Sequence, residues 1–173
     1  MLPETLYPIY QSEETDIMKT EPNRTPYNIR PVHEKAAPYR KMISPKLAKQ
    51  LQQGIVSIIV NEKRYRDPHF SAQELAKELN TNTRYLSAVI NDKFGMNFSV
   101  LVNKYRIRDA KKMLESKRYE QMTIADISYK VGFANRQSFY ASFYRLIGIT
   151  PRTYRKQKLE ELNQAAQETE KQR

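Results

Sequence analysis

The sequence contains no cysteine, only two histidines and only four glycines among its 173 residues. The absence of cysteine excludes a disulfide framework, a thiolate metal site and a cysteine nucleophile. His33 and His69 have no partner at metal-ligand spacing, and each is interpreted as a solvated loop histidine. A phosphate-binding G-x-x-x-x-G-K-[ST] loop, an H-E-x-x-H zinc motif and a nucleophile elbow are also missing. We therefore predict no enzymatic activity, no metal and no cofactor.

Long hydrophobic runs are missing as well. No segment approaches the ~18 consecutive apolar residues that a membrane-spanning helix needs. The N-terminal sequence MLPETLYPIYQSEE is acidic and contains proline, unlike a signal peptide, so we expect a soluble cytoplasmic protein. Hydrophobic residues make up 39% of the chain, below the ~45–50% of typical globular domains. Part of the chain is therefore expected to lie outside any core.

Positive charge is abundant and is concentrated in one part of the chain. Residues 46–158 contain 22 of the 30 Lys and Arg residues but only 9 of the 19 Asp and Glu residues, a net charge of +13. Residues 1–45 have no net charge, and residues 159–173 carry −2. A basic body of this kind is typical of a protein that binds a polyanion, either nucleic acid or an anionic membrane surface.

The first 45 residues contain seven of the nine prolines, a spacing that interrupts a helix before it can repay the cost of nucleation. We predict that residues 1–45 are largely disordered. Two interpretations of this segment stay open: an inert leader or linker, and a docking tail that binds a partner through Tyr7, Ile9 and Tyr10.

From residue 46 onward, apolar residues recur at helical spacing and no segment has the alternation of a strand. Ser71 and Glu74 form a capping-box sequence, and Thr123 and Asp126 form a second one. Together with the other caps, the pattern predicts an all-α protein with seven helices, over about residues 46–62, 71–80, 82–95, 97–116, 123–131 and 135–148 and from residue 150 onward. Residues 159–173 are expected to be a polar, fraying helix end.

Two of these segments, residues 71–95 and 123–148, repeat one another. Before the turn the counterpart of each residue lies 52 positions later, as in Leu75 and Ile127, and after the turn it lies 53 positions later. Each segment has a short helix, a tight turn at Asn or Gly, and a second capped helix, which is the helix-turn-helix pattern. The second helix of such a unit lies in the major groove of DNA.

A long helix over residues 97–116 is predicted to join the two units. Its length of roughly 28 Å, at 1.5 Å per residue, is close to one turn of DNA once the bulk of each unit is added. A single chain can then contact two successive major-groove segments of one duplex, and no dimer is required. We expect a monomer or a weak dimer.

Residues 46–158 contain a series of short motifs. They are Glu74-Leu75-Ala76, Tyr85-Leu86-Ser87, Phe94 to Phe98, Tyr105-Arg106-Ile107, Val131-Gly132-Phe133, Ser138-Phe139-Tyr140 with Phe143, and Gly148-Ile149-Thr150-Pro151 with Tyr154-Arg155. Together these motifs resemble the DNA-binding domain of AraC/XylS-type transcription regulators. The resemblance implies seven helices in two helix-turn-helix units and a function in transcriptional control. It departs from the family in two ways: 45 proline-rich residues cannot form the usual effector domain, and Ala88 stands where many members have a longer side chain.

Outward residues near the start of each second helix are the candidates for contact with DNA bases. They are Thr83, Arg84, Ser87, Ala88 and Asn91 in the first unit and Arg136, Gln137, Tyr140 and Ala141 in the second. An arginine can donate two hydrogen bonds to guanine, a glutamine can pair with adenine, and an alanine can contact a thymine methyl group. For Arg84 and Arg136 a phosphate contact stays open as the alternative.

A second set of residues is predicted to contact phosphates or to form solvated surface. It comprises Arg106, Lys111, Lys112, Tyr144, Arg145, Arg152 and Arg155. Arg106 has a third interpretation, an ion pair with Asp109 on the same helix.

These features together predict a nucleoid-associated regulator that binds double-stranded promoter DNA in a sequence-specific way. Members of the family usually activate transcription. The resemblance therefore implies an activator, with RNA polymerase as a further partner. The alternatives are a non-specific nucleoid or RNA-binding protein and an adaptor that acts through its N-terminal segment. Membrane binding is disfavoured because the apolar residues are needed for packing between helices.

Overall fold

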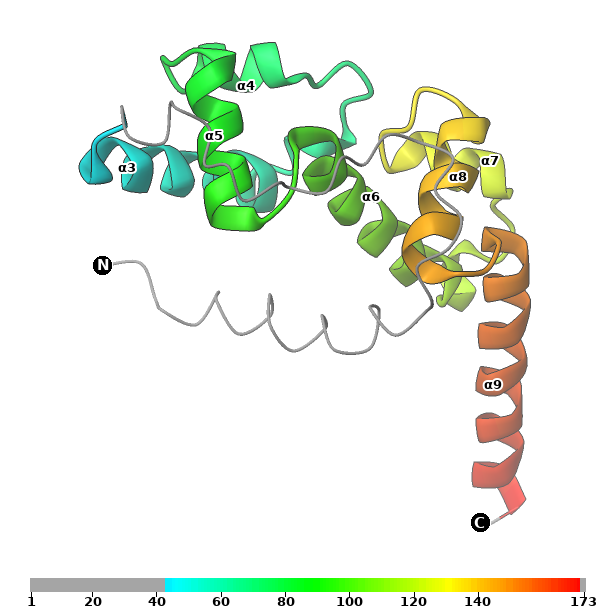
Figure 1. The fold of residues 1–173 in the computed structure, drawn as a ribbon. Helices are drawn as coiled ribbons and strands as arrows, with labels where there is room; N and C mark the ends of the chain where they lie inside the picture. Colours follow the sequence, from blue (N-terminus) through cyan, green and yellow to red (C-terminus); the bar gives the residue numbers. More distant parts are fainter. Residues whose placement is uncertain (1–42, 172–173) are drawn as a thin grey trace.

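The computed structural model describes residues 43–171, which form seven α-helices and contain no β-strand (Figure 1). The helices are α3 (Pro45–Val56), α4 (Ala72–Glu78), α5 (Thr83–Phe94), α6 (Phe98–Leu114), α7 (Ile124–Lys130), α8 (Arg136–Ile147) and α9 (Pro151–Lys171). The predicted fold class and the seven helices are confirmed. The docking-tail interpretation of Tyr7, Ile9 and Tyr10 lies outside the described residues.

Side-chain caps begin the helices where the sequence predicts them. The hydroxyl of Ser71 accepts a hydrogen bond from the Glu74 amide at 3.2 Å, and the Glu74 carboxylate accepts one from the Ser71 amide at 2.9 Å. Thr123 and Asp126 form the equivalent reciprocal pair at the start of α7. The remaining predicted caps are made by Asn82, Asn97, Asn135 and Thr150. Each cap satisfies amides that a helix start leaves without an intrahelical partner.

The two ends of the helical region differ from the prediction. The first helix ends as an α-helix at Val56 and continues as a π-helical turn over Ser57–Asn61, followed by a 3₁₀ turn over Arg64–Arg66. The wider π-turn carries two consecutive buried side chains, Ile58 and Ile59. At the other end, α9 continues to Lys171 and projects from the rest of the molecule (Figure 1), and the fraying of its polar end stays a prediction.

The buried residues form two separate hydrophobic clusters with no member in common. The first is built from α3, α4, α5 and the N-terminal half of α6, and the second from the C-terminal half of α6 with α7, α8 and α9. Leu101 and Val102 of α6 belong to the first cluster, whereas Ile107 and Ala110 belong to the second. The prediction of a central helix that packs in two directions is therefore confirmed.

Within residues 43–171, no helix has the length and apolar character needed to cross a membrane.

Candidate nucleic-acid interface

The two predicted units lie at opposite ends of α6 (Figure 1). In the first, α4 is followed by a turn in which Asn80 has a positive φ of 48°, and then by α5. In the second, α7 is followed by a turn in which Gly132 has a φ of 99°, and then by α8. The helix-turn-helix arrangement that the repeat predicts is thus present twice.

The second helix of the first unit separates its apolar and polar residues by face. Leu86, Val89 and Ile90 of α5 are buried in the first cluster. Thr83, Arg84 and Ser87 are exposed, and Asn91 is half-buried. The exposed candidates begin at the N-terminal end of the helix, which is the part that contacts base edges in helix-turn-helix proteins.

The prediction that Ala88 faces the groove does not agree with its position in α5. We expected its methyl group in the groove, but Ala88 is buried, with 9% of its surface exposed. A methyl group extends little beyond the helix backbone, and the side chains one turn before and after it project further. The candidate contact residues of α5 that reach the surface are therefore Thr83, Arg84, Ser87 and, in part, Asn91.

The second helix of the second unit has a larger exposed face. Phe139 and Phe143 of α8 are fully buried. The predicted contact residues Arg136, Gln137, Ala141, Tyr144 and Arg145 are exposed, and Tyr140 is half-buried. Tyr144 is among the most exposed large side chains of the described residues, at 60%.

Arg136 and Tyr140 form a pair one helical turn apart on this face. The guanidinium carbon of Arg136 lies 4.9 Å from the centre of the Tyr140 ring. Its Nη2 atom also donates to the Tyr140 hydroxyl at 3.4 Å. A guanidinium held over an aromatic ring has lost part of its rotamer freedom before any partner arrives.

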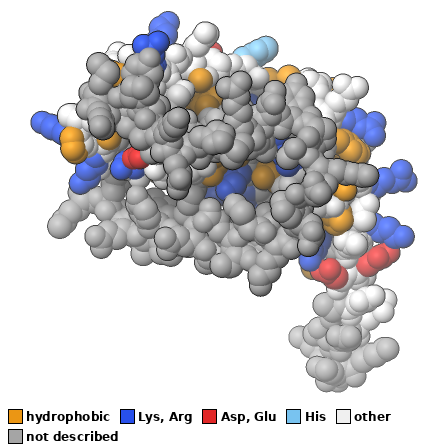
Figure 2. All heavy atoms as spheres, in the orientation of Figure 1, with side chains coloured by type: hydrophobic (Ala, Val, Ile, Leu, Met, Phe, Trp, Pro, Cys, Tyr) orange, Lys and Arg blue, Asp and Glu red, His pale blue; other side chains and the backbone are white. Residues whose placement is uncertain are grey.

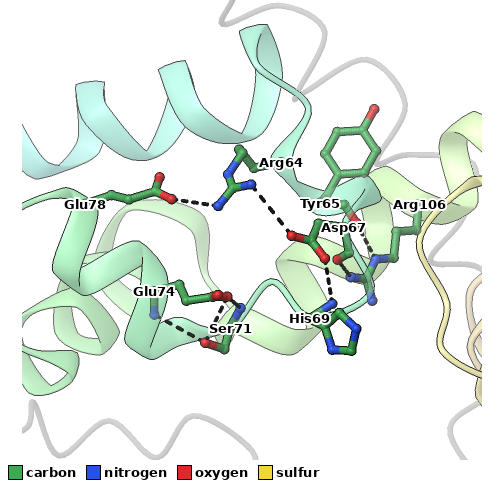
Figure 3. A network of polar contacts seen from close by, with 8 residues as sticks. All are labelled: Arg64, Tyr65, Asp67, His69, Ser71, Glu74, Glu78 and Arg106. Carbon is green, nitrogen blue, oxygen red and sulfur yellow. Dashed lines mark hydrogen bonds and ion pairs between the residues drawn. The ribbon is translucent and has the colours of Figure 1, made fainter.

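Arg106 corrects the predictions for α6. It is buried, with 9% of its surface exposed, and its guanidinium donates to two backbone carbonyls, those of Tyr65 at 2.6 Å and Asp67 at 2.9 Å (Figure 3). Burial lowers the pKa of Arg106, and the nearby Asp67 opposes that shift. A side chain used in this way is neither a phosphate contact nor solvated surface. The expected ion pair with Asp109 is also wrong, because the Asp109 carboxylate accepts from Arg66 instead.

Arg155 needs a similar correction. It is half-buried, and its Nη1 atom donates to the carbonyl oxygen of Met122 at 2.7 Å. Burial lowers its pKa, which Glu120 partly offsets. Arg155 thus fastens α9 to the residue that precedes the Thr123 cap and is a structural residue in this conformation, not a surface cation.

The other predicted phosphate contacts lie on the surface. Lys112 and Arg152 are exposed, whereas Lys111 is half-buried, with its ammonium group 5.9 Å from the centre of the Tyr154 ring. On the face drawn in Figure 2, Lys and Arg side chains appear at many places in the described surface, with few acidic side chains among them. The basic character of residues 46–158 is therefore presented to solvent.

A polar network around Tyr65 was missed by the sequence reasoning. The buried Tyr65 hydroxyl donates to the Asp109 carboxylate at 2.7 Å, and Arg66 donates to the same oxygen through Nε at 3.0 Å. Burial and the Asp109 carboxylate raise the pKa of Tyr65 to about 12. Tyr65 and Asp109 lie 44 residues apart, so no local spacing relates them.

Beside this network, Arg64 bridges the loop to α4. Its guanidinium donates to the Glu78 carboxylate at 2.8 Å, and Asp67 lies 3.6 Å away (Figure 3). The Asp67 carboxylate also accepts from the backbone amide of His69 at 2.9 Å, and the His69 side chain is exposed. The loop that precedes the first unit is therefore held at several points.

The comparisons with known proteins agree with this geometry. The family model described as a helix-turn-helix domain matches residues 75–157, which begin within α4 and include α5, α6 and the whole second unit. The chain carries an AraC-type helix-turn-helix domain. The predicted family is thereby confirmed.

Three known proteins are similar to this chain over about two thirds of its length. The uncharacterised HTH-type transcriptional regulator YtdP of Bacillus subtilis is 36% identical over 110 residues, which are 64% of this chain and only 14% of that protein. The C-terminal domain of the two-component response regulator yesN from Fusobacterium nucleatum is 30% identical, with a TM-score of 0.52 over 62% of this chain and 97% of that one. A transcriptional regulator of Chromobacterium violaceum with an AraC-type DNA-binding domain shares the fold, at 18% identity and a TM-score of 0.52 over 66% of this chain and 96% of that one.

Proposed function

We propose that this protein regulates transcription by binding double-stranded DNA sequence-specifically, with α5 and α8 as recognition helices in two successive major-groove segments. The observation that carries the proposal is the duplicated geometry. Each recognition helix buries its apolar side in its own core and exposes polar side chains from its N-terminal end onward. Two such faces on one α6 fit two adjacent grooves of a duplex.

The length of α6 supports this arrangement. Its 17 residues span roughly 26 Å at 1.5 Å per residue, and the cores at its two ends add to the separation of the recognition helices. Successive major-groove segments on one face of DNA lie ~34 Å apart. The net charge of +11 supports a polyanionic partner, since neutralised phosphates contribute much of the affinity of such proteins.

The two kinds of DNA contact are assigned to different residues in this proposal. Base edges are contacted by Thr83, Arg84, Ser87 and Asn91 from α5 and by Arg136, Gln137, Tyr140 and Ala141 from α8. Phosphates are contacted by Lys112, Tyr144, Arg145 and Arg152. Arg106 and Arg155 are left out because they donate to backbone carbonyls.

The finer assignments follow from the same proposal. The protein acts as an activator in the cytoplasm, associated with the nucleoid, and contacts RNA polymerase at the promoter. It binds DNA as a monomer or a weak dimer, since both recognition helices belong to one chain and no dimer is required to fill two grooves. It performs no catalysis and needs no cofactor, consistent with a domain type that serves DNA binding.

A selection experiment tests the proposal. The full chain is incubated with random duplexes, the bound sequences are recovered, and the affinity for the best sequence is compared with that for a scrambled duplex at several salt concentrations. We expect a preference of at least ~1000-fold for the selected sequence and a steep fall of affinity with salt for both duplexes.

Equal affinity for the two duplexes would contradict sequence-specific binding and favour a non-specific nucleoid protein. Tighter binding to structured RNA than to any duplex would favour the RNA-binding alternative.

A further inference from the structure

The two units do not share a core, so something other than continuous apolar packing must fix their relative orientation. The two hydrophobic clusters have no residue in common. A hollow of about 250 Å³ is lined by residues of the loop before the first unit, of α6 and of the second unit, among them Phe70, Arg106, Phe133 and Ser138. The orientation of α5 relative to α8 therefore depends on α6 and on a few identifiable contacts.

One of these contacts joins the loop before the first unit to the turn of the second. A Cβ atom on Gly132 would lie 2.5 Å from the carbonyl oxygen of Tyr65 and 2.7 Å from the carbonyl carbon of Arg66. The backbones of the two segments thus touch at a point where only glycine leaves room. Such close backbone contact allows little sliding of one unit against the other.

Arg106 holds both sides of this contact. Its guanidinium donates to the carbonyls of Tyr65 and Asp67 in the loop, and its central carbon lies 5.4 Å from the centre of the Phe133 ring in the turn. Phe133 is itself buried in the second cluster. One buried side chain of α6 therefore bonds to the loop of the first unit and packs on the turn of the second.

The loop also donates hydrogen bonds to α6, whereas in the Arg106 bonds α6 is the donor. The Asp109 carboxylate accepts from the Tyr65 hydroxyl and from Arg66, one turn of α6 after Arg106. We call Tyr65, Arg66, Arg106, Gly132 and Phe133 the inter-unit contact. Its hydrogen bonds are directional, and the backbone of Gly132 lies too close to the loop to shift. Together these contacts select one orientation of the two units.

We infer that the inter-unit contact fixes the phase between α5 and α8 and makes the protein specific for one spacing of two DNA half-sites, with Arg106 as the positioning residue. This inference rests on the proposed function. Inserting one base pair between half-sites separates them by roughly 3.4 Å and rotates one relative to the other by roughly 34°. A rigid pair of recognition helices cannot follow that change, whereas a pair released from the inter-unit contact can.

The first test measures the geometry without DNA. The chain has no cysteine, so Ser87→Cys and Ala141→Cys place two unique spin labels on the exposed faces of α5 and α8. We expect one narrow distance distribution in the otherwise native chain and a distribution at least about twice as wide after Arg106→Gln. Equal widths in a folded Arg106→Gln protein would overturn the inference.

The second test measures spacing selectivity on the sequence selected in the binding experiment. With one base pair inserted between the half-sites, the native protein should lose at least about tenfold in affinity, and Arg106→Gln should lose less than about threefold. Affinity for an isolated half-site should be the same in both proteins. A general loss of structure in Arg106→Gln would lower that affinity, so this measurement distinguishes the two causes. If Arg106→Gln keeps the native selectivity, the inference fails while the proposed function stands.

Two further variants complete the design. Arg64→Gln alters the same loop but removes bonds to Glu78 of α4 and to Asp67 of the loop itself, which do not involve α6 or the second unit. Its spacing selectivity should therefore equal that of the native protein. Arg66→Gln removes only the half-exposed outer bond to Asp109 and keeps the test available if Arg106→Gln does not fold. It should shift selectivity in the same direction by a smaller factor, and no shift would count against the inference. If the native protein prefers no sequence at all, the proposed function is what fails.

Discussion

The two helix-turn-helix units share a framework and differ in what they expose. Both begin with a reciprocal capping box, and both end their second helix at a glycine with positive φ, Gly95 or Gly148. At equivalent outward positions, however, the first unit has Thr83 and Ser87 where the second has the Arg136–Tyr140 pair. The caps and turns that define the fold are alike in the two units, while the exposed candidate contact residues differ.

The turns of the two units differ for a separate reason. Asn80 and Gly132 occupy equivalent positions and both have positive φ. Asparagine tolerates that conformation when its side chain has space. At Gly132 any Cβ would collide with the backbone of Tyr65 and Arg66. The positive φ alone explains the asparagine in the first turn. The glycine in the second turn is also required by the close contact with the loop around Tyr65.

The largest effect is expected from Gly132→Ala. The new methyl group meets backbone atoms in a strained conformation, so the variant should lose about 3 kcal/mol or more in the free energy of unfolding. Gly148→Ala is the matched control, since its φ of 84° is similar but nothing lies within 4 Å of the added Cβ. It should lose only ~1–2 kcal/mol. Urea denaturation of both variants tests the difference, and equal losses would refute the role of the contact.

A second prediction compares equivalent positions of the recognition helices. Arg136→Ala should weaken binding to the selected duplex by ~1–3 kcal/mol and relax base preference at one position. Thr83→Ala removes a shorter side chain and should weaken binding by less than ~1 kcal/mol. Lys112→Ala serves as the phosphate control and should weaken all duplexes alike, reducing the salt slope by about 1. If Arg136→Ala also weakens all duplexes alike, Arg136 is a phosphate contact.

The caps should give a smaller effect that is alike in both units. Ser71→Ala and Thr123→Ala each remove one capping hydroxyl and should each cost ~1 kcal/mol in the free energy of unfolding. Ser71→Thr and Thr123→Ser keep the hydroxyl and should be close to neutral. Thermal unfolding of the four variants measures this, and a loss confined to one unit would show that the caps are not equivalent.

The smallest predicted effect is a dependence of stability on pH. Hydrogen bonds from the Thr123 hydroxyl and amide lower the pKa of Asp126 below its ordinary value of 3.8. Because the folded-state pKa is depressed, this stabilisation is present above pH ~4 and is lost as the pH falls through the folded-state pKa. NMR titration of the Asp126 carboxyl carbon should give a pKa below the ordinary value in the native protein, and the depression should shrink in Thr123→Ala. An unchanged titration in Thr123→Ala would contradict the assigned cause.

Much of the fold was predictable because its determinants are local. A cap acts on an amide three residues away, and an apolar stripe repeats within one or two turns, so the starts of the helices and the buried faces of α5 and α8 follow from neighbouring residues. The family resemblance also rested on short segments of this kind, and the matched domain confirms it.

The errors concern side chains whose partners are far away in the chain. Arg106 donates to carbonyls 41 and 39 residues away, and Arg155 donates to one 33 residues away. From the sequence, each was an arginine in a basic region, indistinguishable from the exposed Lys112. Whether a cation faces solvent or a carbonyl depends on which backbone the fold brings beside it.

The sequence by itself determined the helices, their caps, the duplication and the charge, because each depends on residue type and on spacing of a few positions. Only the tertiary structure decided that Ala88 is buried, that Arg106 serves the junction between the units, and that Gly132 is needed for closeness as well as for conformation. The roles of Arg106 and Gly132 depend on how the loop around Tyr65 packs against α6 and the turn at Gly132. No pattern of neighbouring residues in the sequence predicts that packing. The physical reason is that burial and steric contact arise only when two segments pack together, whereas helix propensity and capping act within a single segment.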